Sequence, residues 1–74
     1  METTELAKGR LAPGVGLSVI LRESDSKPPA VHIVWPAEPT AVAARQFPAV
    51  VGRAMTILAR ASVKLSQIRR DRKL

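Results

Sequence analysis

Residues 15–35, VGLSVILRESDSKPPAVHIVW, decide the fold, because they contain two strand patterns joined by a polar turn. The first nine residues alternate between apolar and small or polar side chains except at Ile20, as a half-buried strand does. The run SDSKPP is rich in turn formers, and AVHIVW then places Val31, Ile33 and Trp35 on one face of a second strand. Together they predict an antiparallel hairpin, which is marginally stable in water without a covering element. The residues expected to face that element from the first strand are Val15, Leu17, Val19 and Leu21.

A long aliphatic helix supplies the covering element in this prediction. Pro48 suits the first turn of a helix, and the residue before a proline disfavours the helical region, so the helix starts near Pro48. Its pattern continues to about Arg70, which gives a length of about 34 Å. The predicted class is α+β, an antiparallel β-hairpin packed on one long C-terminal α-helix (ββα). Residues 13–74 form this single domain, and residues 1–12, which mix charges with weak periodicity, are expected to be a partly disordered N-terminal arm.

The helix is apolar over more of its circumference than one contact with a hairpin requires. From Phe47 onward, apolar residues recur at alternating steps of four and three, the spacing of helices that pack on each other. We therefore expect a homodimer through this helix, with Gly52 among the small residues that would permit close approach. The alternative is a monomer in which the N-terminal arm covers the second apolar face. The predicted dimer seam consists of Val51, Ala54, Leu58, Ala61, Leu65 and Ile68.

Trp35, the one tryptophan of the chain, has two interpretations. It is expected to be the largest core side chain, packed against the helix. The alternative is an anchor in an interface, because tryptophan is favoured in binding hot spots.

Composition limits the function classes. A chain of 74 residues forms one domain, whose core rarely supplies more than about 3–5 kcal/mol without reinforcement. The absence of cysteine and the single histidine, His32, exclude disulfides and a metal site built from these residues. Self-association is the remaining reinforcement. No serine has the context of a nucleophile elbow, and His32 has no catalytic partner at motif spacing, so we expect a protein that is not an enzyme and uses no cofactor.

The net charge of +6 lies entirely in the second half of the chain, because residues 1–37 carry four acidic and four basic residues. This asymmetry favours an anionic partner, nucleic acid first and an acidic protein second. The basic tip of the helix is what the helix dipole favours, but a further basic row runs back along the polar stripe. A solvated helix face is the alternative interpretation. The candidate binding residues are Arg53, Arg60, Lys64, Arg69, Arg70, Arg72 and Lys73.

A cytoplasmic location is expected. The first twelve residues contain two acids and no apolar stretch, unlike a secretory signal peptide. No window holds the roughly 20 apolar residues of a transmembrane helix. A basic amphipathic helix can lie on an anionic membrane, but here its apolar face is needed to cover the hairpin, so membrane binding is not expected.

The run VHIVWPAEPT at 31–40, followed by FPAVVGRAMTILARASVKLSQIRR at 47–70, is similar to short uncharacterised proteins carried by actinobacterial phages and mobile elements. The likeness covers roughly the last 45 residues and rests on WPAEPT, FP and a helix rich in alanine and arginine. It implies a small accessory or regulatory protein and transfers no functional residue. The expected function is therefore a regulatory module that binds nucleic acid; the alternative is a protein-binding adaptor, modulator or assembly subunit.

Overall fold

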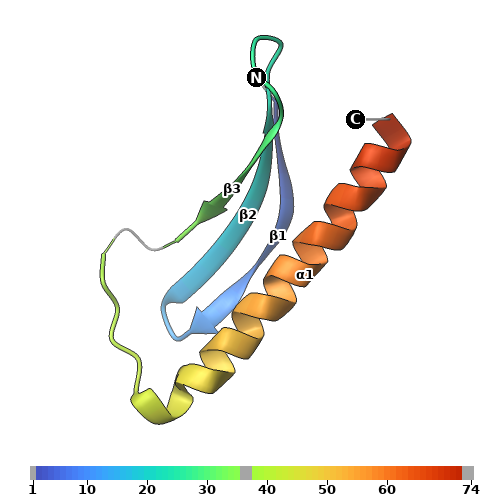
Figure 1. Cartoon of the computed structure of the whole chain (residues 1–74). Helices are drawn as coiled ribbons and strands as arrows, with labels where there is room; N and C mark the ends of the chain where they lie inside the picture. The colour runs from blue at the N-terminus through green and yellow to red at the C-terminus, as the bar shows by residue number, and fades with distance from the viewer. Residues whose placement is uncertain (1, 36–37, 73–74) are drawn as a thin grey trace.

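The computed structural model describes residues 2–35 and 38–72 and contains one antiparallel sheet and one long helix (Figure 1). The strands lie in the order β1-β2-β3, and the helix packs on one face of the sheet. The α+β class and the hairpin on a long C-terminal helix are therefore confirmed, with one strand more than the sequence predicted. The elements are β1 (Glu2–Ala12), β2 (Val15–Glu23), β3 (Ala30–Val34), a short 3-10 turn (Ala44–Gln46) and α1 (Phe47–Arg72).

Strand β2 is the centre of the core, because it has a neighbour on each side and the helix above it. Its alternating residues point toward α1 as predicted, and Leu17, Val19 and Leu21 are the most completely buried side chains. The predicted hairpin is β2 with β3, which pair antiparallel with Val19 opposite Ile33 and Leu21 opposite Val31. The register therefore puts Val31 and Ile33 on the helix side of the sheet.

The expectation of a partly disordered arm at 1–12 is wrong for residues 2–12, which form β1. This strand pairs with β2 along its length, but the register shifts between Glu5 and Ala7 and again between Arg10 and Ala12. Each irregularity breaks the two-residue alternation, which is the signal that sequence reading depends on. The turn to β2 is closed by Gly14, whose φ of 74° is a conformation that glycine adopts without strain.

The helix begins and ends within two residues of the prediction, but its heptad series faces its own sheet. Ala61 of this series and Ile57 beside it are buried in the core shared with β1 and β2, and most other members of the series pack around them. The residues predicted as a dimer seam are thus largely used within one chain, because the N-terminal residues form a strand under α1. Of that set only Val51 remains among the exposed large apolar residues, while Ala54, Leu58, Leu65 and Ile68 are partly buried against the core.

The prediction that Trp35 belongs to the core is wrong. Its side chain is 54% exposed, and all five residues of β3 are exposed as well. The cause is the position of α1, which packs on β1 and β2 and lies away from β3 (Figure 1). Within the described part of the chain, β3 therefore has no cover on the helix side.

Candidate nucleic-acid interface

Three basic residues of α1 lie on the flank of the helix that faces the free edge of β1. Arg53 and Arg60 line a shallow hollow of about 540 Å³ together with Gly9 and Arg10 of that strand. Lys64 lines the adjoining hollow, which also includes Arg60 and Leu6. The helical spacing that predicted the row is therefore correct, and the structure adds that the row runs beside a strand edge.

Arg53 is held in place by the sheet. Its guanidinium donates a hydrogen bond of 2.9 Å to the main-chain carbonyl oxygen of Leu11, in a partly buried position. A guanidinium has five N–H donors, so this bond leaves most of them for another acceptor. The bond fixes the start of the basic row at the end of β1, which reduces the ordering needed on binding.

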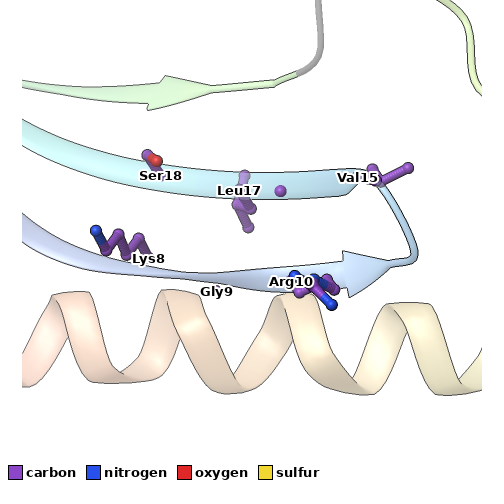
Figure 2. A pocket seen from close by; sticks show the side chains of 8 residues that line it. Lys8, Gly9, Arg10, Val15, Leu17 and Ser18 are labelled. Atoms are coloured by element: carbon purple, nitrogen blue, oxygen red, sulfur yellow. The ribbon is translucent and has the colours of Figure 1, made fainter.

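Two further basic residues, Lys8 and Arg10, lie on β1 next to this row, and sequence analysis missed them. Both are exposed and two residues apart, so they project from the same face of the strand, which is the face away from α1 because Gly9 between them approaches Ile57. Figure 2 shows them on β1 beside α1, in a hollow of about 490 Å³ that also includes Ser18. Their cross-strand neighbours are Ser18 and Gly16, which are too small to cover them. The alternation of Lys8 and Arg10 was visible in the sequence but had no meaning until 2–12 became a strand.

The two hollows adjoin, because Gly9 and Arg10 line both of them. We call the exposed cations along them, together with Lys64 of the third hollow beside Arg60, the basic band. Neither hollow is lined by an aspartate or glutamate. Along the chain, residues 39–70 hold six basic residues and no acidic one. The basic band consists of Lys8, Arg10, Arg53, Arg60 and Lys64.

The basic helix tip does not behave as one unit with the row. Arg69 and Arg70 are exposed in the last turn. Arg72 instead forms an ion pair with Glu23 at the end of β2. Lys73, the remaining predicted residue, lies outside the described residues. The structure therefore leaves Arg69 and Arg70 as the exposed cations of the tip and assigns Arg72 to a contact between helix and sheet.

Three further features of the described part of the chain concern metal binding, membrane-spanning helices and the one histidine. It contains no group of three or more histidine, cysteine, aspartate and glutamate residues that could hold a metal ion. Across 2–35 and 38–72, no helix has the length and apolar character needed to cross a membrane. His32 lies exposed on β3, opposite Ile20 of β2.

Comparisons of the chain with protein-family models, with curated proteins and with solved structures found no match. The resemblance to short proteins of actinobacterial phages and mobile elements therefore stays a prediction. The assignment of function rests on the chemistry of the surface alone.

Proposed function

We propose that this chain is a small accessory or regulatory module that binds nucleic acid through the basic band, without catalysing a reaction. The observation that carries the proposal is that cations of β1 and α1 line two hollows that meet at Gly9 and Arg10 and that no carboxylate lines. Cations gathered on a surface attract a polyanion and release its condensed counterions on binding.

The dimensions of the band suit a phosphate backbone. Arg53 and Lys64 are eleven residues apart on one helix, which corresponds to about 16 Å. One strand of B-DNA carries about five phosphates over that length, at 3.4 Å of rise each. Arginine can make bidentate contacts to phosphate, and three of the five residues of the band are arginine. An acidic protein could bind the basic band in the same way only if its surface carried carboxylates about as closely spaced as these phosphates.

The residues of the band contact phosphate rather than read bases. The two aromatic residues, Trp35 and Phe47, lie outside the residues that line the hollows of the band, so the band has no stacking platform for bases. Binding through phosphate contacts alone depends weakly on sequence and steeply on salt. We therefore expect similar affinities for random-sequence duplexes of equal length.

The test is a salt series with a fluorescently labelled random-sequence duplex, read by anisotropy. With four or five phosphate contacts, the logarithm of the binding constant should fall with log salt at a slope of about −3.6 to −4.5. Replacing Arg60 and Lys64 by glutamine should reduce the magnitude of the slope by about 1.8, because two contacts are lost. Far-UV circular dichroism should be unchanged, since both residues are exposed.

A matched control removes the same charge elsewhere. Arg22 and Lys27 line a different hollow, around the turn between β2 and β3. Their replacement by glutamine should leave the slope nearly unchanged. If both double variants lower the slope equally, only net charge matters and the basic band is not the site. A third pair, Arg69→Gln with Arg70→Gln, tests whether the helix tip extends the band.

A protein-binding adaptor is the second candidate, and one observation favours it. The side chains of Val31 and Ile33 are 43% and 45% exposed beside partly buried residues of α1, which leaves an apolar surface uncovered. Absence of duplex binding at low salt, together with a protein partner that survives nuclease treatment in a pull-down, would favour this function over nucleic-acid binding.

A further inference from the structure

The apolar residues on the helix side of β3 are exposed to solvent. Val31 and Ile33 form one wall of an apolar groove of about 180 Å³, and Leu58 and Leu65 of α1 form the other. Val19, at the floor, is buried, whereas β3 itself is exposed throughout. No residue among 2–35 and 38–72 fills this groove, and an exposed apolar surface of this kind marks an interaction site.

The molecule as a whole exposes more surface than a compact monomer of its mass does. The chain exposes 5719 Å². A compact monomer of 8.0 kDa exposes about 4,450 Å², so the excess is about 1,300 Å². The radius of gyration of 14.3 Å is likewise larger than the roughly 11 Å of a compact domain of this length. A specific protein interface buries about 800 Å² per partner, so the excess is enough for one.

The two edges of the sheet differ in a way that selects β3 for pairing. β1 has two register shifts and carries charged residues along its length, features that prevent a further strand from adding. Strand β3, AVHIV, pairs with β2 without a shift and contains no proline, lysine, arginine or acid. Its outer edge therefore has the properties of a strand that pairs with another chain.

We propose that the edge of β3, together with the groove beside it, binds a second copy of this chain, with β3 antiparallel to β3 about a two-fold axis at His32. This register sets Val31 of one copy opposite Ile33 of the other, twice, on the helix side. Pairs of β-branched residues in direct opposition stabilise a sheet. A register shifted by one residue would put the two helices on opposite faces and pair Val31 with His32.

Trp35 completes the apolar cluster in this arrangement. It follows β3 directly, so the alternation of the strand continued by one residue puts it on the side of Val31 and Ile33. In the paired sheet it lies diagonally from Val31 of the other copy, within reach of a long side chain. This accounts for the 54% exposure of Trp35 in the single chain. The axis differs from the helix seam that the sequence predicted.

The basic band lies at the opposite edge of the sheet, so the dimer leaves it accessible. Dimerisation and nucleic-acid binding therefore use separate surfaces. An experiment can contradict either proposal and leave the other standing.

The first experiment is sedimentation equilibrium of the full chain without nucleic acid, from low to high micromolar concentration. The mass should rise from the 8.0 kDa monomer toward twice that value. Emission from Trp35, the one tryptophan, should shift to shorter wavelength over the same range as its indole loses water. Ile33→Lys should give a monomer with red-shifted emission at every concentration. The control is Val63→Lys, which changes a residue of similar character, 60% exposed on α1 outside the groove, and should dimerise normally.

Single cysteines then locate the axis, because the chain has none of its own. Opposite residues of an antiparallel pair lie about 4.5–5.5 Å apart at Cα, within the range of a disulfide. His32→Cys should therefore cross-link under mild oxidation. Ala59→Cys, on an exposed position of α1, should not. A monomer at all concentrations, or cross-linking at Ala59→Cys but not at His32→Cys, would overturn the proposal.

Discussion

Gly9 offers a sharp test of how closely α1 approaches the sheet. A Cβ atom at this position would lie 2.7 Å from Cδ1 and 3.0 Å from Cγ1 of Ile57. Carbon atoms are in favourable contact at about 3.5–4.0 Å, so the closer approach is about 0.8 Å too short. Gly9→Ala therefore inserts a methyl group between β1 and α1 that fits only if the side chain of Ile57 shifts.

The expected net effect is destabilisation by up to about 2.6 kcal/mol. Overpacking of a core contact costs about 1–3 kcal/mol. The lower chain entropy of alanine in the unfolded state offsets about 0.4–1 kcal/mol of this cost. For a domain of this size, each kcal/mol corresponds to a fall in Tm of about 4–8 °C.

A second substitution tests whether the contact with Ile57 causes the destabilisation by Gly9→Ala. Ile57→Val removes Cδ1 and alone should cost about 0.5–1.5 kcal/mol. In the double variant the alanine methyl occupies the vacated space, so the two costs should not add. We expect a coupling free energy of at least about 0.5 kcal/mol in a double-mutant cycle.

The assay is urea unfolding followed by far-UV circular dichroism, at one fixed protein concentration because association changes apparent stability. The matched control is Gly16→Ala on β2, whose Cβ would meet the nearest atom, the carbonyl oxygen of Gly9, at an ordinary 3.7 Å. This variant should be neutral or slightly stabilised. Equal stability of the two alanine variants, with no coupling between Gly9 and Ile57, would refute the close approach of helix and strand.

Three other substitutions follow from the packing. Gly52→Ala should stabilise the protein by about 0.5–1 kcal/mol in urea unfolding, because nothing lies within 4 Å of the added methyl group and glycine is unfavourable inside a helix; a loss of dimer in this variant would favour the helix seam. Trp35→Ala should cost less than about 1.5 kcal/mol of monomer stability, well below the roughly 3–5 kcal/mol of a core tryptophan, while weakening association. Arg72→Gln, which removes an exposed ion pair with Glu23, should lower Tm by a few degrees at low salt and hardly at all at high salt, as a salt series of melting curves would show.

The hairpin and the helix could be predicted because their signals are local. Along β2 the residues at 15, 17, 19 and 21 are apolar, with Ile20 the one apolar residue between them, and Pro48 marks the start of the helix. The strand at 2–12 could not be found in the same way, because two register shifts interrupt its alternation and charged residues occupy its exposed face. Its pairing with β2 depends on residues across the turn at Gly14, which a window along the chain does not include.

The candidate site was predictable to the extent that it lies on one element. Helical spacing found Arg53, Arg60 and Lys64, since their common flank follows from 3.6 residues per turn. The contribution of Lys8 and Arg10 depends on which strand lies beside the helix, and this is a property of the packed molecule. The error at Trp35 has the same origin: the strand pattern is correct, but the helix lies over the other edge of the sheet.

If the chain dimerises through β3 and binds nucleic acid through the basic band, the direction in which Ile33→Lys changes duplex affinity tests both proposals together. Five strand spacings separate the two β1 strands of the paired sheet, so they lie about 24 Å apart, with a basic band at each outer edge. A duplex that reaches both bands gains from the second contact being intramolecular.

Ile33→Lys adds a positive charge, which by electrostatics alone would strengthen binding to a polyanion. If the variant is monomeric, it loses the second band, so its affinity for a long duplex should fall. Its affinity for a short oligonucleotide that reaches one band should be unchanged or slightly higher. Val63→Lys adds the same charge beside the basic band without removing the dimer, and should strengthen binding to both ligands. Tighter binding of the long duplex by Ile33→Lys would show that the two bands do not act together.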